Sequence, residues 1–128
     1  MDSGLADEIV AATLADGGAT VDVTSGTLLT ADDSWYFPRY PECTRIVPVD
    51  GLAAAVLAFA IDHEDVLRTE RRWLGTWLNP GSGQCYLDVI TRSASRSEAL
   101  ALARRYGREG GRRILAICNP LRQATEYV

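Results

Sequence analysis

Hydrophobic side chains recur at helical spacing near the start of the chain. Residues 3–16 place Leu5, Ile9 and Ala12 on one side, and two glycines follow directly. Apolar residues three and four apart form one face of a helix, and glycine favours its end. We therefore expect a helix over residues 3–16. Over residues 19–30, two β-branched runs flank a Ser-Gly turn, which predicts a short hairpin.

After residue 43 the pattern alternates between strand and helix periods. Short apolar and β-branched runs predict strands over residues 44–49, 73–78, 84–91 and 113–118, and helical spacing predicts helices over 51–69 and 95–106. This order predicts an α+β fold with a ferredoxin-like βαββαβ core over residues 44–118. The single domain, residues 1–128, would be completed by the N-terminal helix, hairpin and aromatic loop of residues 1–43 and by a C-terminal tail over 119–128.

The composition is that of an ordinary globular domain. Of the 128 residues, 47% are hydrophobic and 23% are charged. The acidic N-terminus lacks the basic and apolar regions of a secretory signal. The longest apolar run, residues 52–61, is about half of the ~20 residues that a membrane-spanning helix needs. We therefore expect a cytoplasmic protein that does not bind membranes.

Charge is distributed unevenly along the chain. The net charge is −4, but residues 1–64 carry −9 and residues 65–128 carry +5. All 13 basic residues are arginine, which we attribute to the codon bias of a GC-rich genome. The basic half could bind nucleic acid or an acidic partner, or the two halves could attract each other within one fold. We favour the internal attraction, because a net negative protein repels polyanions.

Four side chains could in principle bind zinc or catalyse a reaction. Cys43, Cys85, Cys118 and His63 match a Cys3His set in number, but the cysteines have no CxxC spacing. The expected sheet places Cys85 at the opposite end from the other two cysteines, so we predict no metal and no cofactor. His63 falls near an apolar stripe, which favours a structural role. No catalytic residue is assigned.

Aromatic and arginine side chains are the candidates for binding a partner. Trp73 and Trp77 lie two steps either side of Gly75 on one predicted strand, and Tyr86 lies on the next, which predicts an aromatic sheet face. Such a face can contact a partner, although it is more often covered by other elements. The candidate partner-binding residues are Trp35, Tyr36, Trp73, Trp77, Tyr86, Arg104, Arg105 and Arg108.

One segment resembles a known group of proteins. It contains Gly75-x-Trp77, the turn Asn79-Pro80-x-x-Gly83 and the run Tyr86-Leu87-Asp88-Val89, with Arg96 and Ala99 further on. It is similar to uncharacterised small proteins of actinobacteria, their phages and mobile elements. Residues 113–119 depart from the Gln-x-x-Ile-x-Asp ending of those proteins. The resemblance implies a phage or mobile-element accessory role and no catalytic residues.

Three functional hypotheses follow, in order of preference. The first is a non-enzymatic cytosolic accessory or regulatory module that binds a protein partner, or itself, through its sheet face or aromatic loop. The second is a nucleic-acid-binding regulator that uses the arginine-rich C-terminal half. The third is an enzyme that depends on a cysteine and His63.

Overall fold

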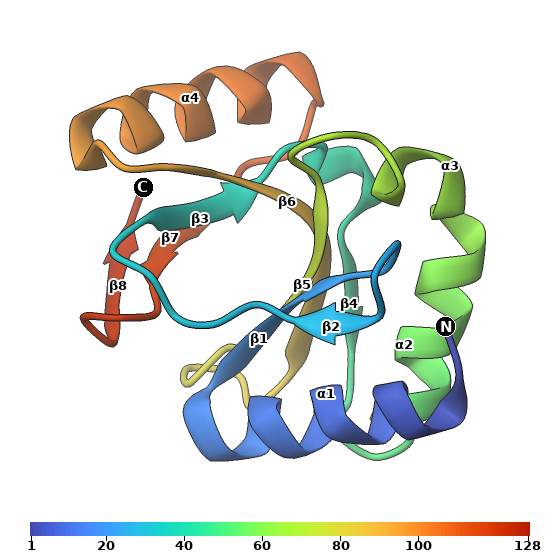
Figure 1. Ribbon diagram of the computed structural model, residues 1–128. Helices are drawn as coiled ribbons and strands as arrows, with labels where there is room; N and C mark the ends of the chain where they lie inside the picture. The colour runs from blue at the N-terminus through green and yellow to red at the C-terminus, as the bar shows by residue number, and fades with distance from the viewer.

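The chain folds around one curled antiparallel sheet, shown in Figure 1. The computed structural model describes residues 1–128. Its helices are α1 (Ser3–Asp16), the 3-10 helix η1 (Pro41–Cys43), α2 (Leu52–Asp62), α3 (Glu64–Leu67) and α4 (Arg96–Glu109). Its strands are β1 (Gly18–Asp22), β2 (Thr27–Leu28), β3 (Trp35–Pro38), β4 (Arg45–Val47), β5 (Trp73–Leu78), β6 (Cys85–Ser93), β7 (Ala116–Asn119) and β8 (Ala124–Tyr127).

The longest strand, β6, organises the sheet. The order across the sheet is β2-β1-β5-β6-β3-β7-β8, and β4 also pairs with β6. On one side β6 pairs with β5 over residues 85–90. On its other side β6 pairs first with β4, over residues 85–87, and then with β3, over residues 90–93. Residues 88 and 89 therefore lie where β6 changes its partner.

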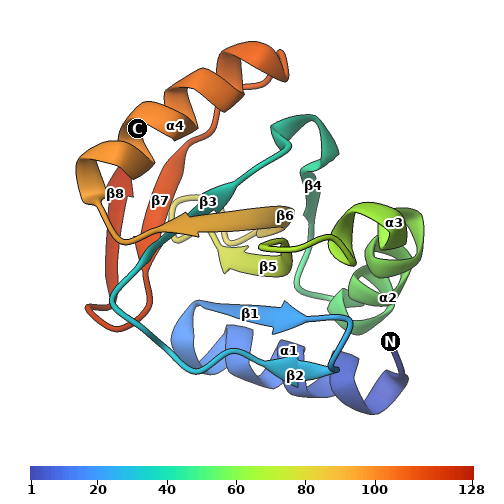
Figure 2. The same ribbon diagram turned by 45° about the horizontal axis from the view of Figure 1, so that its top comes forward.

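The helices pack on the outer, convex side of this curl, as Figure 2 shows. Beneath α1 and α2 lies one hydrophobic cluster that includes Ile9, Phe59 and Leu87. Beneath α4 lies a second cluster, which includes Phe37 and Ile117. Because side chains alternate along a strand, each inner strand buries one face under a helix and turns the other face to the concave side.

Hydrogen bonds fix α1 against the sheet. The helix begins after Asp2, whose carboxylate accepts from the Leu5 N–H at 2.8 Å. The buried Thr13 hydroxyl shares a 2.6 Å hydrogen bond with the hydroxyl of Thr76 on β5. The Thr76 hydroxyl also accepts from the Ala19 N–H at 3.0 Å. The expected helix and hairpin over residues 3–30 are thus confirmed, and polar groups join them to β5.

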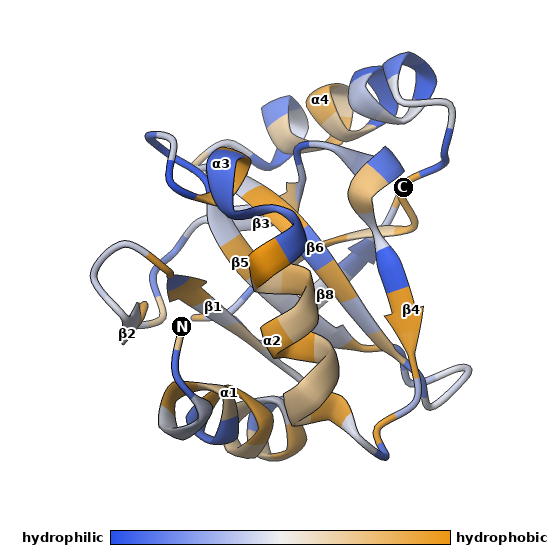
Figure 3. Ribbon diagram, turned by 90° about the vertical axis from the view of Figure 1, so that its right-hand side faces the viewer, coloured by the Kyte–Doolittle hydropathy of each residue, from blue (hydrophilic) through white to orange (hydrophobic).

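The helices α2 and α4 differ in character. Figure 3 shows α2 hydrophobic along most of its visible length, as its sequence of alanine, leucine, valine and phenylalanine requires. The expected helix over residues 51–69 is two helices, since α2 ends before His63 and α3 follows. By contrast, α4 is amphipathic, and Ser95 is its N-cap, since the Ser95 hydroxyl accepts from the Glu98 N–H at 3.2 Å.

Three expectations about topology need revision. The mixed α+β class is confirmed, but a ferredoxin-like core is not: β4 pairs with β6 but not with β7, and β3 lies between β6 and β7 instead. The expected loop over residues 31–42 contains β3, which lies between β6 and β7. The expected tail over residues 119–128 contains β8, which pairs with β7.

None of the helices combines the length and the apolar character needed to cross a membrane.

Candidate binding site on the concave face

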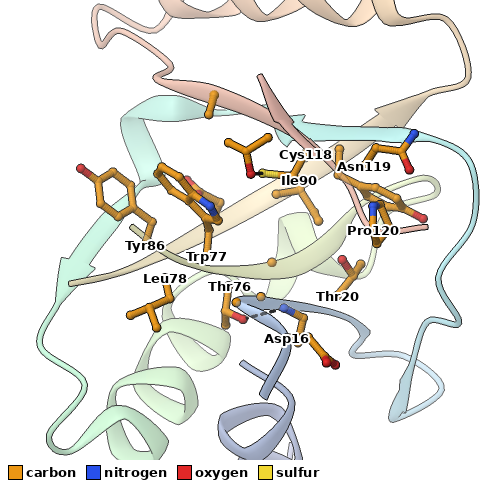
Figure 4. Close-up of a pocket in the computed structure, with 18 of the residues that line it drawn as sticks. Asp16, Thr20, Thr76, Trp77, Leu78, Tyr86, Ile90, Cys118, Asn119 and Pro120 are labelled. Carbon is orange, nitrogen blue, oxygen red and sulfur yellow. Dashed lines mark hydrogen bonds between the residues drawn. The ribbon is translucent and has the colours of Figure 1, made fainter. Parts of the chain in front are cut away.

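A pocket of about 690 Å³ occupies the concave side of the sheet. Its walls come from β1, β2, β3, β5, β6, β7 and β8, from the last turns of α1 and from the loops that follow β2 and β7. Its lining is mostly apolar and includes polar groups such as Asp88 and Asn119, and both its volume and its lining are typical of ligand sites. Figure 4 shows Trp77, Tyr86, Ile90 and Cys118 among the side chains that surround it.

The floor of the pocket consists of alternate residues of β5 and β6. The strand register pairs Trp73 with Ile90, Gly75 with Asp88, and Trp77 with Tyr86. The intervening residues Leu74, Leu87 and Val89 point into the core beneath the helices. A Cβ atom on Gly75 would lie 2.8 Å from two carbons of Ile90, so this close approach requires glycine.

At one end of this floor the aromatic groups are already engaged. The Tyr36 and Trp73 rings meet edge to face with centroids 6.2 Å apart. The Arg92 guanidinium lies 4.8 Å from the Trp73 ring centroid and donates a 2.9 Å hydrogen bond to the Tyr36 hydroxyl. Asp32 accepts from the Tyr36 hydroxyl at 2.7 Å and from Arg92 at 3.0 Å. We name Asp32, Tyr36, Trp73 and Arg92 the closed cluster.

At the other end the aromatic pair has no such partner. The Trp77 and Tyr86 rings also meet edge to face, with centroids 5.2 Å apart. The Tyr86 hydroxyl accepts only a long hydrogen bond, 3.4 Å, from the Asn79 amide. Arginines lie over the rings of Tyr36, Tyr40, Phe59, Trp73 and Tyr106, but none lies over Trp77 or Tyr86. We name Trp77 and Tyr86 the open pair.

A buried carboxylate lies next to the open pair. Asp88 is only 7% exposed, and it lines both the main pocket and a smaller one behind it. The Thr44 hydroxyl donates a short hydrogen bond to one of its carboxylate oxygens, and no protein group donates to the other. Arg112 is close enough to influence Asp88, but its guanidinium donates to the Thr44 carbonyl at 2.6 Å and forms no ion pair with the carboxylate.

The position of Asp88 in the sheet explains its burial. It lies at the point where the pairing partner of β6 changes from β4 to β3, and Thr44 lies in the segment between those two strands. Burial raises the pKa of Asp88 to about 6, against the smaller lowering effects of the Thr44 hydrogen bond and the Arg112 charge. A carboxyl group perturbed in this way, within a pocket, marks a candidate functional site.

The cysteines and the histidine do not assemble around this pocket. Burial raises the pKa of Cys118, which lines the pocket, and of Cys85 to about 11, so both stay protonated at neutral pH and are weak nucleophiles. His63 lies outside the pocket, with its ring 4.5 Å from that of Phe59. Burial and the Arg45 charge lower the pKa of His63. No group of three potential ligands lies close enough to hold a metal ion.

The candidate residues from the sequence separate into three locations. Tyr36, Trp77 and Tyr86 line the pocket, and Trp73 lies beside them in the closed cluster. Trp35 is 6% exposed and packs beneath α4. The last three, Arg104, Arg105 and Arg108, are exposed on α4. The structure therefore unites the aromatic sheet residues and separates them from the arginines.

Asp88 and Gly75 were not among the site residues expected from the sequence. A signal was present, because Asp88 interrupts the otherwise apolar run of residues 85–90, two residues from both Tyr86 and Ile90. Period-2 alternation alone places these three side chains on one face. What the sequence did not show is that the face is concave and that no helix covers it.

Comparisons with protein-family models, with curated proteins and with solved structures find no match for this chain.

Proposed function

We propose that the protein is a non-enzymatic accessory module that binds a segment of a partner protein in the concave pocket. The observation that carries this proposal is the pocket itself: seven strands line about 690 Å³ of mostly apolar space that no helix fills. Open aromatic faces of this kind favour recognition of apolar and aromatic groups.

The size of the pocket favours a chain segment over a single small group. Its lining extends from Asp16 at the end of α1 to Pro120 beyond β7, across the full width of the sheet. The resemblance of residues 74–89 to small proteins of actinobacterial phages and mobile elements supports an accessory role in the cytoplasm. That segment supplies most of the pocket floor, including both members of the open pair.

A library of random peptides displayed on phage, selected against the immobilised protein, tests the proposal. We expect enriched peptides that bind the unaltered protein and lose binding to Thr20→Phe. Thr20 lines the pocket from β1, where its neighbour Val21 points into the core, so the larger ring enters the pocket rather than the core.

Arg108→Ala provides the control for that selection, because Arg108 is exposed on α4 and does not line the pocket. Peptides that bind Thr20→Phe as well as the unaltered protein would contradict the proposal, as would a library that yields no enrichment. Light scattering on the same samples tests self-association, in which a second copy supplies the segment.

A second candidate function rests on the outer face of α4. Arg104 and Arg108 are exposed there without an acidic partner, whereas Arg105 pairs with Glu109 at 2.8 Å. A nucleic acid bound on this face would be held through its phosphates, so its affinity would fall steeply with salt. Fluorescence anisotropy with a labelled oligonucleotide, compared between the unaltered protein and the double variant Arg104→Ala/Arg108→Ala, tests this alternative.

A further inference from the structure

We infer that the partner segment presents an arginine or lysine side chain to the pocket. Its charged head would donate to the free oxygen of Asp88 and lie against the rings of Trp77 and Tyr86. This inference rests on the proposed function, and it adds the chemistry that the pocket selects. Three independent observations support it: the charge of the lining, the unpaired carboxylate and the uncovered aromatic pair.

The lining of the pocket carries only one sign of charge. None of the 13 arginines of the chain lines it, and its only charged residues are Asp16 and Asp88. Asp16 lies at the rim, at the end of α1, and Asp88 lies on the floor. Carboxylates within low-dielectric walls concentrate the negative potential in the pocket, which attracts cations and repels anions.

The Asp88 carboxylate forms no ion pair, although the charge of Arg112 is close enough to lower its pKa. A buried ionised group is costly unless hydrogen bonds and an opposite charge compensate it, and Asp88 has one hydrogen bond, from Thr44. Asp88 lines the pocket from the same face of β6 as Tyr86, and the residue opposite it, Gly75, has the Ile90 side chain packed over it. A guanidinium or ammonium group that enters the pocket can therefore reach the second oxygen.

The open pair offers the second half of a cation site. On the same face, Arg92 lies over Trp73 and bonds to the carboxylate of Asp32, so a guanidinium there combines an aromatic ring with an acid. Trp77 and Asp88 reproduce this combination on the other side of Gly75, but no arginine of the chain occupies it. The protein thus contains an internal example of the contact that the partner would make.

The electrostatic state of Asp88 agrees with this role. Burial raises its pKa to about 6, so the carboxyl group remains largely ionised at neutral pH and is available to accept from a cation. The net charge of −4 favours a basic partner at longer range.

The inference is tested with two capped amino acids, N-acetyl-arginine amide and N-acetyl-citrulline amide. These have the same shape, but the citrulline side chain is neutral. Binding is followed by NMR titration of the pocket resonances. We expect the arginine amide to bind the unaltered protein at least about tenfold more tightly, which is the effect of one charged hydrogen bond.

Asp88→Asn should abolish this preference, because the amide oxygen can still accept from Thr44 but the charge is gone. Asp65→Asn removes one negative charge from the exposed surface of α3 and should retain the preference. Trp77→Leu, which keeps Asp88, should reduce the preference. The dispersion of the amide resonances of each variant reports whether it is folded.

Equal binding of the two amides, no binding of either, or a preference that survives in Asp88→Asn would overturn the inference. These outcomes are separable from failure of the proposed function. If the displayed peptides lose binding to Thr20→Phe but share no basic residue, the proposed protein-binding function stands. The inference that the pocket selects a cation then fails. A lysine amide probe, N-acetyl-lysine amide with a free ε-amine, distinguishes guanidinium from ammonium recognition.

Discussion

The two ends of the concave face contain the same kinds of group in different states. In the closed cluster, Arg92 links Asp32 to the rings of Tyr36 and Trp73. In the open pair, the rings of Trp77 and Tyr86 lie near the carboxylate of Asp88, and no arginine joins them. The closed cluster is thus satisfied by the chain itself, whereas no cation of the chain lies over the rings of the open pair.

The closed cluster also shows how charged groups of the two halves of the sequence pair with each other. Asp32 pairs with Arg92 and Asp33 pairs with Arg122, so neighbouring acids of the first half bind arginines of the second. The attraction between the halves that we favoured from the sequence is visible in these two ion pairs. Asp88 and the open pair lie outside this internal pairing.

The largest expected effect concerns the unpaired carboxylate of the open end. Because burial raises the pKa of Asp88 from 3.8 to about 6, the folded protein holds this proton more tightly than the unfolded chain does. Protonation therefore stabilises the fold, and this contribution is complete below pH 3.8 and is lost as the pH rises through 6. At about 1.4 kcal/mol for each pKa unit, the contribution amounts to about 3 kcal/mol.

Urea denaturation of the unaltered protein and Asp88→Asn over this pH range measures that contribution. The free energy of unfolding of the unaltered protein should fall relative to that of Asp88→Asn as the pH rises. Asp65→Asn should run parallel to the unaltered protein. A difference between the unaltered protein and Asp88→Asn that stays constant with pH would show that the carboxyl group is not perturbed.

The next effect concerns the residue that separates the two ends. Gly75→Ala should destabilise the fold by about 1 to 3 kcal/mol, since the new Cβ would lie 2.8 Å from two Ile90 carbons and the site would be overpacked. Chemical denaturation measures the change. In an Ile90→Ala background the same substitution should cost far less, and equal costs in the two backgrounds would contradict this packing explanation.

The smallest effect compares the two tyrosines. Tyr36→Phe removes a hydroxyl that donates to Asp32 and accepts from Arg92, so it should cost about 1 to 2 kcal/mol. Tyr86→Phe removes only the 3.4 Å contact with Asn79, so its cost should stay within about 0.5 kcal/mol. Thermal unfolding of both variants gives the comparison, and similar losses would mean that the two ends do not differ as described.

Local patterns were enough to predict the floor of the pocket. The strand expected over residues 73–78 has the bounds of β5, and the strand expected over 84–91 corresponds to β6. Alternation within these two strands predicted a shared face for Trp73, Trp77 and Tyr86, and the structure places them there. These inferences held because a hairpin is set by neighbouring residues and by its turn.

Two strands that form the walls of the pocket, β3 and β8, could not be predicted from local sequence patterns. In β3, Trp35, Tyr36 and Phe37 are all buried, because one face contacts α4 and the other lines the pocket, so no alternation was visible. Nearby prolines also suggested a loop. In β8, alternating half-buried and exposed residues give only a weak strand signal. Pairing with β6 and β7, which is long-range, decided the case of β3, whereas β8 forms a local hairpin with β7.

The change of partner along β6 has a consequence for how the molecule assembles. The β5–β6 hairpin closes over a few residues, whereas β1, β3 and β7 must find partners that are tens of residues away in the sequence. Loop closure over such distances is slow, so the hairpin is the natural nucleus and the outer strands join it later. The wall formed by β7 and β8 comes from residues 116–127, which follow every other strand in the chain. During synthesis the pocket is therefore completed after every other part of the sheet.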